Sequence, residues 1–326
     1  MRVLLAGFLG LFCIVTATVP VLADPAETEI EAPGPNGPLK GLMVAADKPD
    51  APVVLIIPGS GPVDRNGNSL HGLNTDTYKL LAQGLAAKGI ASVRIDKRGM
   101  FSSAAAIPNA NNVTIADYAS DVHTWAEAIH KKTGGKCIWV LGHSEGGLVA
   151  MVAAKGNPPD ICGLLLVATP GRPFADLIKD QMRSNPANAP IQDEAFHDID
   201  ELAAGHRVDL SNAPAALQVL FPAAVQGYLI DLFSYDPPKV LAAYKGPALI
   251  CQGDHDIQLA VNDAHLLAAA EPNAKLVLMP DVNHVLKTVK SDNRDYNLKT
   301  YFDPSLPIAP SVVETLAEFI ASPKSP

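Results

Sequence analysis

Residues 142–146 (GHSEG) combine a serine with the spacing of glycines that a reactive serine needs. They fit the pattern G-x-S-x-G, with an apolar run before them that predicts a strand and a segment after them that predicts a helix. On so tight a turn the serine hydroxyl is lifted off the sheet, and glycines on both sides remove side chains that would collide. The pattern therefore indicates a nucleophile at Ser144, with His143 packed under the turn.

A serine hydroxyl needs a base to take its proton and an acid to orient that base. Where the serine sits on such a turn, the chain order is serine, acid, histidine. Asp254 and Asp256 follow an apolar run at 248–251, and His284 follows another at 276–279. Histidine suits the base because its pKa lies near working pH. We predict His284 as base and Asp256 as acid; Asp254 is the alternative, although an acid directly after a glycine can instead shape the turn.

The negative charge that develops on the substrate's carbonyl oxygen in the transition state needs hydrogen-bond donors, and a glycine-rich bend can supply them. Residues 58–62 (PGSGP) follow the apolar run 53–57, and backbone N–H groups of such bends stabilise an oxyanion. The predicted donors are the N–H groups of Ser60 and of Glu145, the residue after the nucleophile.

No pattern in the chain predicts a metal or a cofactor. Residues 64–68 (DRNGN) offer calcium-type oxygen ligands, but the glycine comes early and Thr75 stands where a bidentate glutamate belongs. The cysteines and histidines lack the spacing of a zinc site.

The segments around these residues alternate as in a parallel sheet covered by helices on both faces. Short apolar runs predict strands, and the amphipathic stretches between them predict helices. The predicted strands are 53–57, 91–95, 137–141, 162–168, 248–251 and 276–279, and the predicted helices are 75–87, 115–131, 146–154, 261–270 and 311–321. The predicted fold class is α/β with a mostly parallel central sheet. Ser144, Asp256 and His284 then share the edge where parallel strands end.

One long interval interrupts the alternation. From about 171 to 244 no strand is predicted, and helical stretches at 173–183, 193–204 and 215–233 are broken by prolines. The interval is too long for a simple connection. We expect one domain over 24–326, with a hairpin at 28–45 and a helical cap insertion at about 171–244.

The first 23 residues have the features of a secretory signal peptide. Arg2 precedes an apolar stretch at 3–15, and small residues lead up to a cleavage site after Ala23. The predicted location is therefore secreted or periplasmic, with no stable membrane insertion after cleavage. An uncleaved N-terminal anchor is the alternative, although the apolar stretch is short for a membrane span.

Three cysteines follow the predicted cleavage site. Cys137 and Cys162 lie near the starts of two neighbouring predicted strands, so a disulfide between them is conceivable. We favour instead three buried, unpaired residues, Cys251 included, since an odd number leaves at least one thiol free.

Composition narrows the range of partners. The chain has 326 residues, 48% of them apolar, and a formal net charge of −9 without any basic run. Nucleic acid is not expected as a partner, because phosphate binding needs a positive surface. The oligomeric state is left open.

Taken together, these motifs resemble the α/β-hydrolase superfamily, in particular its bacterial esterases and serine-aminopeptidase-like hydrolases. The resemblance spans about residues 38–320 and is carried by 58–62 (PGSGP), 64–65 (DR), 96–99 (DKRG), 142–147 (GHSEGG), 252–258 (QGDHDIQ) and 283–287 (NHVLK). It implies Ser144, Asp256 and His284 as a catalytic triad and a small-molecule ester or amide as substrate. Many members have a histidine where this chain has Pro58, a departure that bears on the oxyanion donors.

The leading functional prediction is a carboxylesterase that acts on esters of small or medium size through an acyl-enzyme on Ser144. An aminopeptidase or amide hydrolase is the second prediction. It needs an acid to hold the substrate's α-ammonium, and Glu145, Glu201 and Asp231 are candidates. A non-catalytic binding protein on the same fold is the third, and it is disfavoured because all three triad positions are filled.

Overall fold

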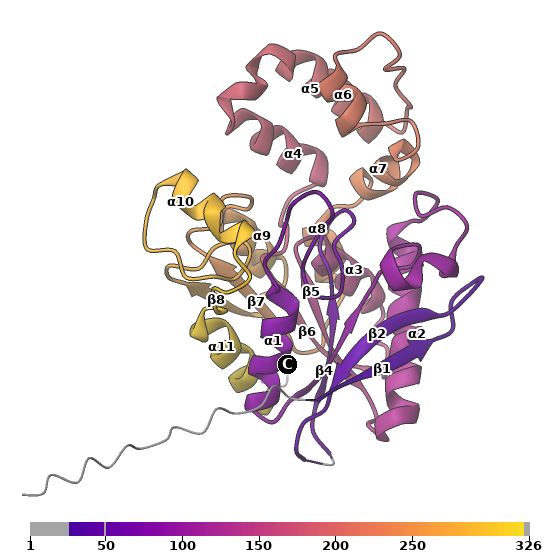
Figure 1. The fold of residues 1–326 in the computed structure, drawn as a ribbon, viewed down its shortest axis with the longest axis vertical. Coiled ribbons are helices and arrows are strands. Elements are labelled where there is room, and N and C mark those ends of the chain that lie inside the picture. Colours follow the sequence, from indigo (N-terminus) through magenta and orange to yellow (C-terminus); the bar gives the residue numbers. More distant parts are fainter. Residues whose placement is uncertain (1–25, 49, 323–326) are drawn as a thin grey trace, which may run out of the picture.

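The computed structural model describes residues 26–48 and 50–322, so the predicted signal peptide lies outside the described residues. An eight-stranded sheet forms the centre of the molecule, with the strand order β1-β2-β4-β3-β5-β6-β7-β8 (Figure 1). The strands are β1 (Glu27–Ala32), β2 (Leu39–Val44), β3 (Val53–Ile57), β4 (Ala91–Ile95), β5 (Ile138–His143), β6 (Ile161–Val167), β7 (Ala248–Gly253) and β8 (Lys275–Met279). β1 and β2 form the predicted antiparallel hairpin, β2 pairs antiparallel with β4, and the six strands β3 to β8 are parallel to one another. The predicted α/β fold class is confirmed.

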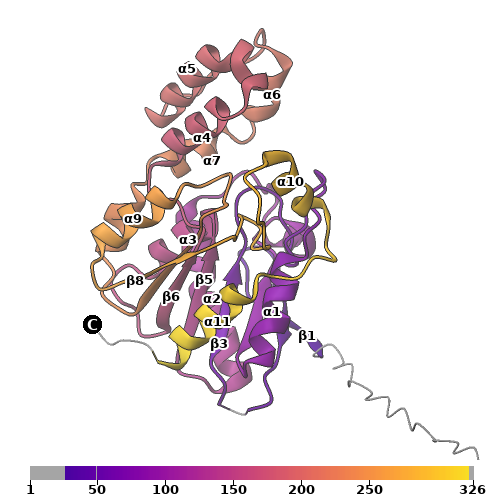
Figure 2. The same cartoon turned by 90° about the vertical axis from the view of Figure 1, so that its left-hand side faces the viewer.

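Both faces of the sheet are covered by helices, which explains why a central strand such as β3 is apolar along its whole length. Along β3, Leu55 and Ile57 join the core on one face, and Val54 and Ile56 join the core on the other, because side chains alternate along a strand. Helices α2 (Ile115–Thr133), α3 (Glu145–Ala153) and α9 (Val261–Ala270) contribute to the first core, and α1 (Thr77–Ala87) and α11 (Pro310–Ala321) to the second. Figure 2 shows α1 and α11 together in front of the sheet.

The longest helix, α2, has clear signals at both ends. Thr114 and Asp117 form a capping box, in which each side chain accepts a hydrogen bond from the other residue's backbone N–H. Gly134 ends the helix with φ 75°, a conformation that glycine adopts without the penalty a side chain would bring. Local sequence therefore determines the bounds of this helix.

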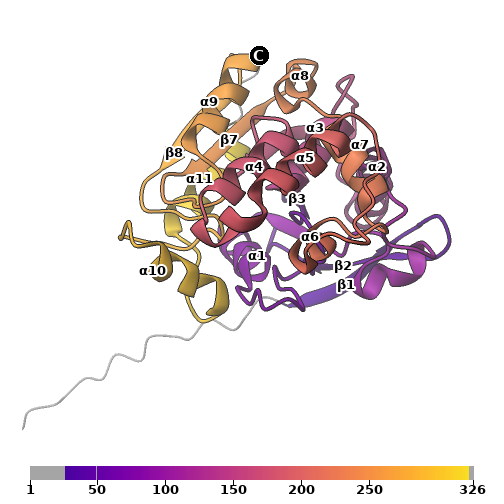
Figure 3. The ribbon, with the colours of Figure 1, turned by 90° about the horizontal axis from the view of Figure 1, so that it is seen from above.

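Between β6 and β7 the chain forms a short 3₁₀ helix (Pro186–Ile191) and five α-helices: α4 (Phe174–Arg183), α5 (Gln192–Ala203), α6 (Ala215–Leu220), α7 (Gln226–Phe233) and α8 (Pro237–Ala242). The first four, here called the cap (residues 174–233), stand over the end of the sheet where the parallel strands finish (Figures 1 and 3). Phe221 has φ −128° and ψ 48° and ends α6. Because Pro222 disfavours a helical conformation in the residue before it, the stretch predicted as one helix at 215–233 is two.

The start of the cap is held by a buried carboxylate on α9. Asp263 accepts hydrogen bonds from the Gly171 N–H at 3.0 Å and from Arg172 Nε and Nη2 at 3.1 Å each. A Cβ on Gly171 would lie 1.9 Å from the Asp263 carbonyl oxygen. The segment that leads into the cap therefore packs directly on α9.

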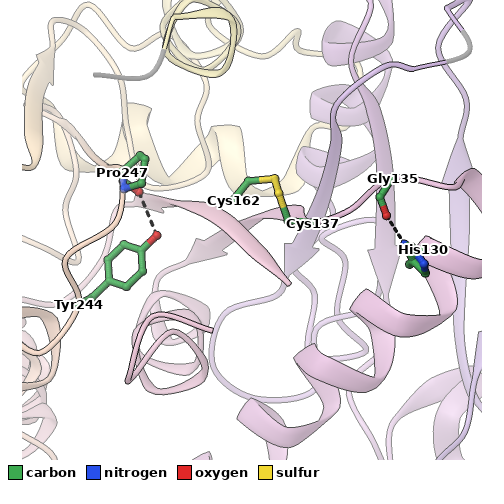
Figure 4. Close-up of a disulfide and its surroundings, with 6 residues drawn as sticks. All are labelled: His130, Gly135, Cys137, Cys162, Tyr244 and Pro247. Carbon is green, nitrogen blue, oxygen red and sulfur yellow. Dashed lines mark hydrogen bonds between the residues drawn. A yellow bond between two sulfur atoms is a disulfide. The ribbon is translucent and has the colours of Figure 1, made fainter. Parts of the chain in front are cut away.

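Cys137 and Cys162 form a disulfide, and the expectation that both are unpaired was wrong (Figure 4). Their Cα atoms lie 5.2 Å apart, which suits a disulfide. The cause is a β-bulge: Ile138 pairs with Ile161 but Trp139 pairs with Gly163, which leaves Cys162 as the additional residue. Cys251 is buried and free, as expected.

Within residues 26–48 and 50–322, no helix is both long enough and apolar enough to span a bilayer.

Candidate active site

Ser144 occupies the turn between β5, which ends at His143, and α3, which begins at Glu145. Its backbone has φ 54° and ψ −123°, a conformation that is strained for a residue with a side chain. A Cβ on Gly142 would lie 2.2 Å from the Gly146 carbonyl oxygen, and a Cβ on Gly146 would lie 2.4 Å from that of Ile57. Both glycines are therefore required by close backbone contacts.

Asp256 and His284 meet although 28 residues separate them in the chain. His284 Nδ1 lies 2.8 Å from Asp256 Oδ2, and both side chains are buried. The other carboxylate oxygen, Oδ1, accepts the N–H groups of Gln258 at 2.7 Å and Leu259 at 2.9 Å. Burial acts to raise the pKa of Asp256, but attraction to His284 and these hydrogen bonds outweigh it, so its pKa is lowered. The carboxylate is therefore ionised and fixed in direction.

Asp254, the alternative acid, is directed elsewhere. Its Oδ1 accepts hydrogen bonds from His255 Nδ1 and from the Asp281 N–H, each at 2.8 Å. Its side chain is 45% exposed, whereas that of Asp256 is 1% exposed. The structure joins Asp256, and not Asp254, to His284.

A cavity of about 500 Å³ has four of the five predicted site residues in its walls. Ser144, His284, Ser60 and Glu145 all line it. The cap contributes apolar side chains to the same cavity, among them Phe174, Leu177, Leu220, Phe221, Leu229 and Leu232. The carboxyl end of the sheet thus supplies the polar groups, and the cap supplies much of the apolar wall.

Two residues that the sequence analysis did not single out fix the glycine-rich bend. The Gly59 N–H donates to Tyr78 Oη at 3.1 Å, and the Gly59 carbonyl accepts from Lys97 Nζ at 2.7 Å. Lys97 Nζ also lies 3.0 Å from Glu145 Oε1, and both side chains are buried. Lys97 belongs to the 96–99 (DKRG) stretch, which was the available sequence signal, whereas nothing local marks Tyr78.

His143 links this bend to His284. Its Nε2 lies 2.8 Å from the His284 carbonyl oxygen, and its Nδ1 lies 2.9 Å from Tyr78 Oη. A carbonyl can only accept, so Nε2 carries the proton and Nδ1 accepts from the tyrosine hydroxyl. Burial, and then repulsion from His284, lower the pKa of His143 to about 3. A neutral imidazole therefore completes a chain of hydrogen bonds from Gly59 through Tyr78 to His284.

The three acids considered for an α-ammonium site are all engaged. The Glu145 carboxylate is paired with Lys97. Glu201 Oε2 lies 3.0 Å from His206 Nδ1, and Asp231 Oδ2 accepts the N–H of Ile115 at 2.7 Å. Of the three, only Glu145 lines the cavity that contains Ser144.

Over residues 26–48 and 50–322, no three His, Cys, Asp or Glu side chains are grouped so that they could hold a metal ion.

Comparisons with known proteins agree with this architecture. The serine aminopeptidase S33 family matches residues 69–287. Lipase 1 of Psychrobacter immobilis is 24% identical over 198 residues, or 57% of this chain and 62% of that protein. Lipase 3 of Moraxella sp. (strain TA144) is 24% identical over 204 residues, or 58% and 64%. The chain thus spans less than two thirds of the length of these relatives.

Solved structures show the same fold. Est1E from Butyrivibrio proteoclasticus has a TM-score of 0.54 at 18% identity, covering 90% of this chain and 99% of its own. The Pyrococcus furiosus esterase Pf2001 has a TM-score of 0.56 at 15% identity, covering 94% and 95%. Since the family match extends over more than half of the sequence, the chain belongs to the serine aminopeptidase S33 family of the α/β-hydrolase superfamily.

Proposed function

We propose that this protein is a serine carboxylesterase that cleaves esters of small or medium size through an acyl-enzyme on Ser144. The observation that carries the proposal is the 2.8 Å hydrogen bond between His284 Nδ1 and Asp256 Oδ2, together with the cavity that both His284 and Ser144, on its strained turn, line. The ionised carboxylate holds the proton on Nδ1, which leaves Nε2 of His284 free to act as a base.

In the proposed reaction, Ser144 Oγ attacks the ester carbonyl carbon while His284 Nε2 takes its proton. Asp256 stabilises the imidazolium that forms. The tetrahedral intermediate collapses when His284 returns the proton to the alcohol oxygen, and the alcohol leaves. Water then attacks the acyl-enzyme with the same proton transfers and releases the acid.

The N–H groups of Ser60 and Glu145 are the proposed oxyanion donors. Glu145 is the first residue of α3, where the helix N-terminus adds partial positive charge. Ser60 adjoins Gly59, whose N–H and carbonyl are bound by Tyr78 and Lys97. A donor held in place before the substrate arrives needs no reorganisation, and loss of one such donor costs about 3–4 kcal/mol of transition-state stabilisation.

The cavity supports an apolar ester as the substrate. Its volume of about 500 Å³ is within the range of small-molecule sites, and the cap residues that line it are apolar. We therefore propose that the cap, which forms most of the insertion predicted at about 171–244, limits substrate size. Two curated relatives are lipases, and one solved neighbour, Est1E, has been seen with ferulic acid bound, which also supports ester chemistry.

Aminopeptidase activity, which the family name suggests, is the second candidate and has weaker support. Holding an α-ammonium requires a carboxylate that is free to face the substrate. Glu145 is already neutralised by Lys97, and Glu201 and Asp231 are not among the residues that line the cavity. A cationic amino terminus would therefore meet no unpaired acid there.

Export from the cytoplasm remains part of the proposal. The Cys137–Cys162 disulfide supports it, because disulfides persist in oxidising compartments such as the periplasm and the extracellular space.

Labelling with a fluorophosphonate probe tests the proposed nucleophile. Wild-type protein should be labelled and should hydrolyse p-nitrophenyl acetate, and Ser144→Ala should lose both properties while keeping its thermal unfolding transition. Aminoacyl p-nitroanilides, tested in parallel, should be poor substrates. Hydrolysis by folded Ser144→Ala at the wild-type rate would refute the assignment of the nucleophile, and a strong preference for aminoacyl amides would favour the aminopeptidase.

A further inference from the structure

A second cavity, of about 440 Å³, adjoins the one that contains Ser144. The two cavities share Gly61, Val225 and Tyr228 in their walls, so they meet where the glycine-rich bend faces the cap. A Cβ built on Gly61 would have no heavy atom within 4 Å. Space at this junction is therefore open.

Most of the second cavity is built on the β4 side of the site. The loops after β3 and β4 and the first turn of α2 supply its apolar walls, which include Pro62, Leu70, Met100, Phe101, Val113 and Tyr118. Burial raises the pKa of Tyr118 and of Tyr228, so both phenols stay neutral. An uncharged apolar group is thus the chemistry that these walls accept.

The one basic residue in this wall is not free to bind an anion. Lys97 Nζ donates to the Gly59 carbonyl at 2.7 Å and lies 3.0 Å from Glu145 Oε1. It also lies 5.2 Å from the centre of the Tyr118 ring, within reach of a cation–π interaction. The Lys97 side chain is 2% exposed, so a carboxylate or phosphate in the second cavity would find its charge already compensated.

We propose that the second cavity receives the acyl chain of the ester, and that the first cavity receives the alcohol. This inference rests on the proposed esterase mechanism, in which His284 must return a proton to the leaving alcohol. The alcohol oxygen therefore lies beside His284, which lines the first cavity and is not part of the second cavity's wall.

The acyl chain leaves the same carbonyl carbon in a different direction from the alcohol. With the carbonyl oxygen at the Ser60 and Glu145 N–H groups, an exit past Gly61 leads into the second cavity. Its volume suits a chain of medium length more than an acetyl group, which would leave it empty. The expected substrates are esters with an apolar acyl chain and an apolar alcohol.

Two series of esters separate the two cavities. One series varies the acyl chain from acetyl to octanoyl at constant p-nitrophenol, and the other varies the alcohol from methyl to octyl at constant acetyl. Ala110→Phe narrows the second cavity, and Ile178→Trp, the matched control, narrows the first. Neither position belongs to the proposed catalytic groups.

Ala110→Phe should lower kcat/KM for the octanoyl ester at least about ten-fold relative to the acetyl ester, a loss typical of altered apolar pockets. It should leave the ranking of alcohols unchanged. Ile178→Trp should change the ranking of alcohols and not that of acyl chains. If Ala110→Phe does not fold, as judged by thermal unfolding, Met100→Trp on the same wall replaces it.

The acyl assignment would be overturned if Ala110→Phe lost kcat/KM equally for acetyl and octanoyl esters. It would also be overturned if only Ile178→Trp changed the dependence of kcat/KM on acyl length. In either case, continued hydrolysis by the wild type would leave the esterase proposal standing. If the wild type cleaves no ester in either series and is not labelled by the fluorophosphonate, the esterase proposal fails, and the acyl pocket fails with it.

Discussion

His143 should make the folded protein sensitive to mild acid. Its imidazole is buried and neutral, with Nε2 bound to the His284 carbonyl and Nδ1 bound to Tyr78 Oη. Protonation of Nδ1 would remove the acceptor for the tyrosine and place a charge in the core. The test compares the stability of the wild type with that of His143→Gln as the pH is lowered. The variant has no imidazole that titrates at this position.

The magnitude follows from the two pKa values. An imidazole in the unfolded chain has a pKa of about 6.5, whereas the pKa of His143 in the folded protein is about 3. Between these values the unfolded state binds a proton that the folded state does not, so acid favours unfolding. Each pH unit is worth about 1.4 kcal/mol, and between about pH 7 and pH 5 the loss from this group is about 2 kcal/mol.

Urea unfolding at about pH 7, 6 and 5 measures this loss, with the disulfide intact in both proteins. His143→Gln should be less stable at pH 7, because its amide cannot keep both hydrogen bonds of the imidazole. Its free energy of unfolding should then fall by about 2 kcal/mol less than that of the wild type on going to pH 5. Equal losses in the two proteins would show that His143 is not the source of the acid sensitivity, because every other titrating group is shared.

Contacts of Asp256, of Gly146 and of the Cys137–Cys162 disulfide lead to three further expected outcomes. Asp256→Asn should lower kcat about 10⁴-fold with p-nitrophenyl acetate, because the amide no longer holds the proton on the histidine Nδ1. Gly146→Ala should lower the melting temperature by about 10 °C or more or prevent folding, since its Cβ would lie 2.4 Å from a backbone carbonyl oxygen. Reduction of the Cys137–Cys162 disulfide, which closes a loop with a sequence separation of 25, should lower the free energy of unfolding in urea by about 3.5 kcal/mol.

Two of these predictions have a control variant in the same chain, and the third has a result that would contradict it. Asp254→Asn should keep most activity, because Asp254 bonds His255 and the Asp281 N–H; a loss as large as that of Asp256→Asn would contradict the assignment. Gly135→Ala should change the melting temperature little, since its Cβ would meet only Thr133 Oγ1 at 3.4 Å. An unchanged urea midpoint after complete reduction would contradict the disulfide prediction.

The sequence predicted those parts of the fold that depend on local patterns. Strands predicted at 53–57 and 91–95 match β3 and β4, and all five residues of each strand are buried. It did not predict α10 (Arg294–Lys299), a helix of six residues with one buried side chain. An element this short has too little periodicity to be recognised.

The site was predictable where residues follow the ends of strands, and not where contacts join distant segments. Ser144, Asp256 and His284 each follow a strand, so the topology brings them to one edge. Tyr78 and His143 are 65 residues apart, and only the packing of α1 against the sheet joins them. The Cys137–Cys162 pair depends on a bulge, and one inserted residue in a strand leaves no local sequence signal.

The disulfide and the proposed active site lie at opposite ends of the same strand. Cys137 comes just before β5 begins (Figure 4), and Ser144 comes just after it ends. A protein whose stabilising cross-link is remote from its reactive groups can gain rigidity at one end without hindering motion at the other. The usual trade-off between stability and activity is then weaker. The amino ends of β5 and β6 are therefore the region where evolution or engineering can add stability with little loss of catalytic rate.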